Sequence, residues 1–151
     1  MDKNFKFNFG DTVKDTISGV CGIVDSRSTY LINENKYFIW VNGLIEGFDE
    51  SQLVLEKSGD YKSPDVLCRF CNGDMVADIF TKTRGTIMGI AEYAAGCFRA
   101  GILTTNPRIN QHGMQTWVFI SDQQLKLIKP ARKNKYIKKL SKELKNEKIN
   151  R

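Results

Sequence analysis

The sequence is poor in the residues on which most catalytic and metal sites depend. Its 151 residues include one histidine, and they contain no phosphate-binding glycine loop, no nucleophile elbow and no carboxylate or histidine cluster with metal-ligand spacing. No apolar run approaches the roughly 18 residues that span a bilayer. Residues 1–6 show neither the apolar segment of a secretory signal nor a lipidation motif. We therefore expect a cytoplasmic protein that is not an enzyme and does not bind a membrane.

The cysteines are weak candidates for chemistry. Cys68 and Cys71 have the spacing of half a zinc site, but no second pair follows at similar spacing. If residues 68–72 form a strand, side chains three apart point to opposite faces and cannot hold one metal ion. Cys97 would need His112 beside it to act as a nucleophile, and nothing in the sequence brings the two together. We expect reduced thiols and no cofactor.

The net charge of +6 is unevenly distributed along the chain. Residues 126–151 hold eleven basic and two acidic side chains, whereas residues 1–125 hold twelve basic and fifteen acidic ones. The C-terminal segment therefore carries a net +9 and the preceding residues −3. A basic arm on a mildly acidic body would attract phosphate through the arm alone.

An internal repeat organises the first 130 residues. Residues 5–15 recur as residues 68–78 at an offset of 63, with a shared Gly-Asp pair. Further matches in the same order are Tyr30 with Tyr93, Ile39 with Ile102, and residues 50–55 with residues 122–127. We align Gly22 with Gly89, which implies a four-residue insertion in the second copy. The shared order of the matches indicates a duplicated module.

Each copy has the pattern of short β-strands. Phe5, Phe7 and Phe9 alternate with polar residues, which predicts a strand with one aromatic face. Short β-branched or aromatic runs at residues 20–24, 37–41 and 53–55 are separated by clusters typical of turns. Several short strands in so few residues favour a five-stranded barrel of the Src-homology-3, Tudor or KOW type. We expect an all-β fold of two tandem barrels, at residues 3–58 and 66–130, joined by a linker at residues 59–65.

The first copy resembles a family of small, uncharacterised phage and prophage proteins that usually carry one such unit. The resemblance rests on residues 10–15 (GDTVKD), 18–23 (SGVCGI), 30–31 (YL) and 48–53 (FDESQL), and in the second copy on residues 92–93, 96–98 and 117–125. The second copy departs from the family at residues 85–89, which are one residue longer, and at 103–116. The likeness covers most of residues 5–128. It implies a viral or proviral origin, a bacterial host cytoplasm and a Src-homology-3-like fold, but no activity.

Aromatic residues supply the candidate binding surface. In residues 37–41 both faces of one strand are apolar, although a small barrel buries only its inner face. The second set would either cement the modules to each other or to the tail, or form an exposed patch for a protein partner or a stacked base. The candidates for such a patch are Tyr30, Trp40, Tyr93 and Phe98, with Arg27, Arg99 and Arg108 at its rim.

Residues 131–151 are predicted to form a basic, helical tail. Pro130 ends the last strand, and Tyr136, Ile137, Leu140 and Leu144 then fall at helical steps of three and four. This stripe would pack on the barrels or dock on a partner, or the lysines would lie along nucleic-acid phosphates. The candidate phosphate contacts are Arg132, Lys133, Lys135, Lys138, Lys139 and Lys142.

These features favour a phage- or prophage-encoded accessory protein that binds, and inhibits or redirects, a host macromolecule. A host protein is the foremost partner, in host takeover or counter-defence, and two copies with different loops would let one chain contact two surfaces. One alternative is a nucleic-acid-binding protein that uses the tail and the barrel aromatics. Another is a structural component of the virion.

Overall fold

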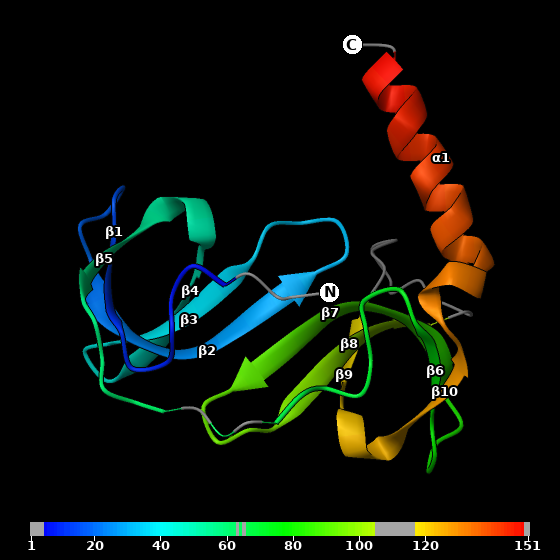
Figure 1. Cartoon of the computed structure of the whole chain (residues 1–151), viewed down its shortest axis with the longest axis horizontal. Helices are drawn as coiled ribbons and strands as arrows, with labels where there is room; N and C mark the ends of the chain where they lie inside the picture. Colours follow the sequence, from blue (N-terminus) through cyan, green and yellow to red (C-terminus); the bar gives the residue numbers. More distant parts are fainter. Residues whose placement is uncertain (1–4, 63, 65, 105–116, 150–151) are drawn as a thin grey trace, which may run out of the picture. The chain divides into compact units, whose positions relative to one another are not determined.

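The computed structural model describes residues 5–62, 64, 66–104 and 117–149, which fold mainly into antiparallel strands (Figure 1). One α-helix, α1 (Lys135–Ile149), follows the last strand of this described part. The predicted β class and the C-terminal helix are therefore confirmed. The chain forms two compact units, which comprise residues 1–67 with 89–99 and residues 68–88 with 100–151.

The first unit is built on a five-stranded antiparallel arrangement. Its strands are β1 (Thr12–Asp15), β2 (Cys21–Tyr30), β3 (Lys36–Val41), β4 (Leu44–Asp49) and β5 (Leu53–Lys57), with a short 3-10 helix η1 (Glu50–Gln52) before β5. They pair in the order β5-β1-β2-β3-β4. The second half of β7 (Arg84–Tyr93) also belongs to this unit, because residues 89–93 pair with the end of β2.

The second copy repeats this strand order. Its remaining elements are β6 (Met75–Asp78), β8 (Phe98–Thr104), β9 (Trp117–Ser121), η2 (Asp122–Gln124), β10 (Leu125–Lys129) and η3 (Ala131–Lys133). β6 pairs with β10 and β7, and β8 pairs with β7 and β9. The order β10-β6-β7-β8-β9 thus matches β5-β1-β2-β3-β4 element by element.

Hydrogen bonds around the Gly-Asp pair also repeat. The amide of Asn8 donates to Oδ2 of Asp11 at 2.9 Å, and the equivalent amide of Cys71 donates to Oδ2 of Asp74 at 2.9 Å. Each aspartate also accepts, at Oδ1, an amide that follows the closing strand of its copy, from Gly59 or Ala131. The preceding glycines have positive φ angles of 81° and 93°. The duplication therefore extends from sequence to individual bonds.

The alignment of Gly22 with Gly89 was wrong. A Cβ on Gly22 would lie 2.3 Å from the carbonyl oxygen of Trp40, and a Cβ on Gly85 would lie 2.3 Å from that of Leu103. Both pairs are related by the offset of 63, so Gly85 is the true equivalent and no insertion precedes it. The offset changes to 72 only between β8 and β9.

The predicted strands at residues 5–9 and 68–72 do not form. The amides of Lys6 and Phe7 donate to the hydroxyl of Tyr37, and that of Asn8 donates to Asp11, so side chains replace a neighbouring strand. Burial still alternates, because Phe7 and Phe9 are buried while Lys6 and Asn8 are exposed. The prediction of the aromatic face was correct although the strand was not.

The two cores use equivalent positions. In the first copy the core contains Phe7, Phe9, Val13, Val24, Tyr37, Ile39 and Leu53. Six of these seven positions are buried apolar residues in the second copy, namely Phe70, Val76, Ile87, Ala100, Ile102 and Leu125. The copies differ where Asn72 replaces Phe9 and a smaller residue, Ala100, replaces Tyr37.

The compact units do not coincide throughout with the predicted division at residues 59–65. The break between residues 67 and 68 lies close to the predicted linker, but residues 89–99 of the second copy cluster with the first. Residues 59–61 also pack on the first unit, where the ring of Tyr61 meets that of Phe9 edge-on at 6.4 Å. The pairing of β2 with residues 89–93 explains the first difference.

Candidate partner-binding surface

Three exposed apolar side chains lie side by side across β2, β3 and β4. Ile23 stands opposite Trp40, and Trp40 stands opposite Ile45. Ile23, Trp40 and Ile45 are 50%, 46% and 48% exposed, respectively. We call this set the outer row. Since scattered exposed apolar residues are ordinary, its contiguity on neighbouring strands is what makes it a candidate interface.

Strand alternation and one irregularity orient Trp40. Tyr37 and Ile39 face the core, and Trp40 therefore points outward. The register of β2 with β3 shifts between Val24 and Ser26, which leaves Asp25 as an extra residue. The indole Nε1 of Trp40 donates to Oδ1 of Asp25 at 3.1 Å, and this hydrogen bond restrains the orientation of the exposed ring.

The other apolar side chain of this strand face is accommodated within its own hairpin. Phe38 stands opposite Gly47, and a Cβ on Gly47 would lie 3.0 Å from the Phe38 ring. The second copy exchanges the two residue types, because a Cβ on Gly101 would lie 3.0 Å from the ring of Phe119. Phe38 is therefore explained by packing on a glycine, and Trp40 is left as the exposed aromatic of β3.

The position equivalent to Ile23 is covered in the second copy. Thr86 occupies it and is 4% exposed. Its hydroxyl oxygen accepts a hydrogen bond of 2.9 Å from Nδ2 of Asn134, which also donates to the carbonyl oxygen of Gly73 at 2.9 Å. Asn134 is itself fully buried. The segment after β10 thus covers the second copy at the position where the first copy leaves Ile23 bare.

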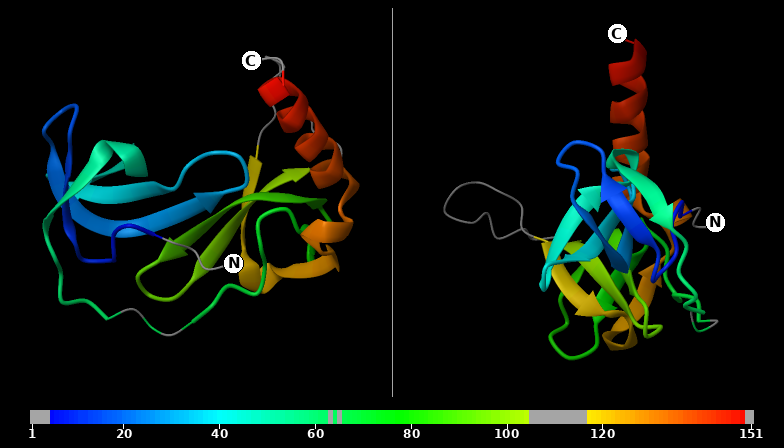
Figure 2. Two further views of the ribbon diagram at one scale, coloured as in Figure 1. Left: turned by 45° about the horizontal axis from the view of Figure 1, so that its top comes forward. Right: turned by 90° about the vertical axis from the view of Figure 1, so that its left-hand side faces the viewer.

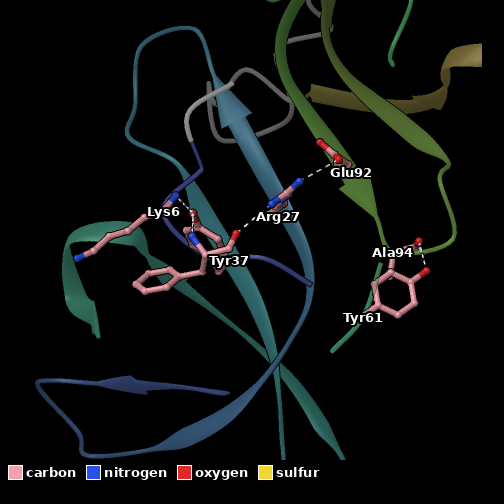
Figure 3. Close-up of polar contacts among 7 residues, drawn as sticks. Lys6, Arg27, Tyr37, Tyr61, Glu92 and Ala94 are labelled. Atoms are coloured by element: carbon pink, nitrogen blue, oxygen red, sulfur yellow. Dashed lines mark hydrogen bonds and ion pairs between the residues drawn. The ribbon is translucent and has the colours of Figure 1, made fainter. Parts of the chain in front are cut away.

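Arg27 joins separate segments of the first unit (Figure 3). Its guanidinium lies 4.3 Å from the centre of the Phe5 ring and 4.4 Å from that of Phe9. It donates to the carbonyl oxygen of Phe7 at 2.9 Å and pairs with Glu92 at 3.2 Å. These contacts join the N-terminal segment, β2 and β7, a role that the sequence alone did not indicate.

Tyr37 forms the second polar cluster of this unit. Its hydroxyl accepts the amide of Lys6 at 2.9 Å (Figure 3) and donates to the carboxylate of Glu50. Burial, followed by the hydrogen bond to Glu50, raises the pKa of Tyr37 above its usual range. The cluster joins the N-terminal segment to η1. The apolar pattern of residues 37–41 predicts that Tyr37 is buried but does not indicate the partners of its hydroxyl.

Four of the remaining predicted patch residues lie on strands other than β3, namely Tyr30, Tyr93, Phe98 and Arg99. Tyr30 and Tyr93 end β2 and β7, and the Tyr30 ring lies where a Cβ on the paired Gly89 would be 2.7 Å away. The prediction that Phe98 belongs to an exposed patch was wrong, because Phe98 is buried. Arg99 is exposed. Arg108, like His112, lies outside the described residues.

Charge is segregated between the two units. Residues of the first unit include eight basic and twelve acidic side chains, a net −4, and those of the second include fifteen basic and five acidic ones, a net +10. All six predicted phosphate contacts, Arg132, Lys133, Lys135, Lys138, Lys139 and Lys142, are exposed. The basic surface and the outer row thus belong to different units.

The thiols and the helix add two observations on the part of the chain with assigned structure. Cys21, Cys71 and Cys97 are exposed free thiols, and no three His, Cys, Asp or Glu side chains among the described residues gather closely enough for a metal ion. Within the same ranges, no helix is both long and apolar enough to cross a membrane.

Comparison of the chain with protein-family models, with curated proteins and with solved structures finds no match.

Proposed function

We propose that this chain is a phage- or prophage-encoded accessory protein that binds a host protein in the bacterial cytoplasm. The outer row of Ile23, Trp40 and Ile45 is the proposed contact. The observation that carries this proposal is the difference between the copies. The same position is covered by the chain's own C-terminal segment at Thr86 and left bare at Ile23.

The chemistry of the outer row fits a protein partner. Tryptophan is enriched among the few residues that supply most of the binding energy at interfaces, because it combines a large apolar face with one hydrogen-bond donor. Here the donor is already satisfied by Asp25. The apolar face of Trp40, between two aliphatic neighbours, is then available at no cost in unpaired polar groups.

We further propose that each copy is a Src-homology-3-like barrel. The support is the shared strand order, β5-β1-β2-β3-β4 and β10-β6-β7-β8-β9, and the equivalence of the two cores. Barrels of this size bury one face of each strand, so outward residues are free to diverge between copies. Binding would then reside in the outward residues, and the duplicated Gly-Asp hydrogen bonds would maintain the fold.

Site-specific photo-crosslinking in bacterial cells tests the proposed contact. A photoreactive residue replaces Ile45 or, as a matched control, Ile32, which is 49% exposed in the turn at the other end of β2. We expect one host protein to be crosslinked from position 45 and not from position 32. Adding Trp40→Ser should reduce affinity for the purified partner at least about 30-fold. Equal labelling at both positions, or a product that survives Trp40→Ser, would contradict the proposal.

A further inference from the structure

We propose that the second unit binds a DNA duplex, with one lysine face of α1 lying along the backbone phosphates. This interaction is separate from the outer row and does not depend on it. The second unit carries a net charge of +10, whereas the first carries −4. Residues 126–151 supply +9 of this charge, and a cluster of basic residues is the footprint of a protein that neutralises phosphates.

The lysines of α1 form a continuous face. At 100° per residue, five of them fall within an arc of about 120°. They are Lys135, Lys138, Lys139, Lys142 and Lys145, and all five are exposed. Lys145 was not among the residues predicted from the sequence. We call this set the lysine face.

The acidic residues of α1 lie beside the lysine face. Glu143 and Glu147 fall outside its arc, and one ion pair, between Lys139 and Glu143 at 3.9 Å, joins the lysine face to an acidic side chain among the described residues. Ile137, Leu140 and Leu144 lie on the opposite side of the helix. Among the described residues, this ion pair offsets the charge of Lys139, and the other lysines of the lysine face point in the same direction without an acidic side chain inside their arc.

The helix is anchored at its first turn and exposed beyond it. Ile137 packs against Gly73, where an added Cβ would lie 3.2 Å from Cδ1 of Ile137, and Asn134 is fixed beneath it. Residues 141–149 are all exposed, and α1 extends away from the strands of its unit in every view (Figure 2). A fixed base with a projecting basic helix presents the lysine face without rearrangement of the unit.

The dimensions of α1 fit the major groove of DNA. Fifteen residues at a rise of 1.5 Å give a length of about 22 Å, and the groove, about 12 Å wide, admits one α-helix. Double-stranded RNA offers a major groove that is too narrow for side chains to read. An anionic lipid surface is less suitable, because the exposed large apolar residues among the described side chains of α1 are aliphatic and few.

Salt-dependent binding of the full chain to a labelled, mixed-sequence 24-base-pair DNA tests the proposal. Five phosphate contacts predict a slope of about −4.5 in log affinity against log salt, so affinity should fall about 500-fold between 50 and 200 mM salt. The double variant Lys138→Gln/Lys142→Gln should fall only about 40-fold. A charge-matched control, Lys57→Gln/Lys148→Gln, removes two lysines outside the lysine face and should behave like the wild type.

Further measurements distinguish DNA from RNA and from lipid headgroups as the source of the bound phosphates. Lys138→Arg/Lys142→Arg should restore the wild-type slope, because the charge is kept. An RNA duplex of equal length should bind more weakly than DNA, and anionic vesicles should not bind at 100 mM salt. The proposal is overturned if both glutamine pairs lower the slope equally, if RNA binds more tightly, if vesicles alone bind, or if the chain does not bind DNA at 50 mM salt.

Discussion

Buried and exposed ion pairs of the first unit should differ strongly in their effect on stability. The side chains of Arg27 and Glu92 are 13% and 15% exposed, whereas those of Lys36 and Asp49 are 39% and 44% exposed. Arg27→Ala leaves the largely buried carboxylate of Glu92 without this cationic partner, so we expect a loss of about 3 kcal/mol in the free energy of unfolding. Lys36→Ala should cost under about 1 kcal/mol. Urea denaturation measures both, and equal losses would contradict the assigned role of Arg27.

Tyr37 should make the first unit sensitive to alkaline pH. Its folded pKa is raised above the unfolded value of about 10, so the unfolded state releases this proton first as pH rises. Stability from this group is therefore complete below pH 10 and is lost above it. Urea denaturation from pH 8 to 11 should show a steeper alkaline decline for the wild type than for Tyr37→Phe. Parallel declines would show that the buried hydroxyl ionises normally.

The duplication identifies one residue in an unfavourable backbone conformation. Lys82 has a φ of 62°, and its equivalent, Gly19, has a φ of 76°. A left-handed conformation costs a residue with a side chain about 1 kcal/mol or more, which glycine avoids. Lys82→Gly should therefore stabilise the second unit by up to about 1 kcal/mol. Gly19→Ala, where an added Cβ meets nothing within 4 Å, should destabilise the first unit by a similar amount. Chemical denaturation of both variants checks these opposite signs.

At the level of single residues, the sequence predicts faces better than contacts. Alternation at Phe5, Phe7 and Phe9 correctly indicated burial, because burial follows side-chain direction. It could not show that the Tyr37 hydroxyl would accept the neighbouring amides, since these residues lie about thirty positions apart. Matching Gly22 with Gly89 failed for a related reason. The constraint on the glycine is a carbonyl oxygen from another strand, not its isoleucine neighbour.

The segment formed by η3 and the start of α1 is an integral element of the second unit. Asn134 is buried and supplies two hydrogen bonds through one nitrogen, to Gly73 and Thr86. Asn134→Ala leaves both acceptors buried without this donor, and we expect a loss of about 1–3 kcal/mol. Asn146→Ala, on the exposed part of α1, should change stability by less than about 0.5 kcal/mol. Hydrogen exchange of β6 and β7 should report the difference. Unchanged protection in Asn134→Ala would assign the segment a peripheral role.

At the level of elements, the prediction of the tail was right about its type and incomplete about its packing. Helical periodicity and Pro130 placed a helix after the last strand. The stripe was expected either to pack on the barrels or to dock on a partner, and in the structure Ile137 is packed while Leu144 is exposed. The bond from Asn134 to Thr86 is a tertiary contact between residues 48 apart, which no local pattern encodes.

At the level of the whole molecule, the pairing of β2 with β7 is symmetric in register. Ser28 stands opposite Ala91, its equivalent at the offset of 63. The flanking pairs, Ser26 with Tyr93 and Tyr30 with Gly89, exchange under the same offset. Equivalent strands of the two copies thus pair as two identical strands would across a twofold axis.

This register predicts the behaviour of the isolated first copy. A fragment of residues 1–62 lacks residues 89–93 and exposes the edge of β2 that they occupied. We expect the fragment to form a dimer in which β2 pairs with β2 and Ser28 faces Ser28. Light scattering after size exclusion, with circular dichroism to establish folding, measures this. A folded, monomeric fragment would contradict the prediction.

A self-complementary ladder between covalently joined copies frees each copy to evolve alone. In a dimer of identical chains, every mutation alters two faces at once, so an apolar patch and a basic helix must appear in pairs. Here a mutation alters one face only. One copy can carry an acidic body with an exposed tryptophan, while the other carries a basic C-terminal segment that covers Thr86. The two copies therefore differ in composition and in surface as the two chains of a heterodimer do, although they belong to one polypeptide.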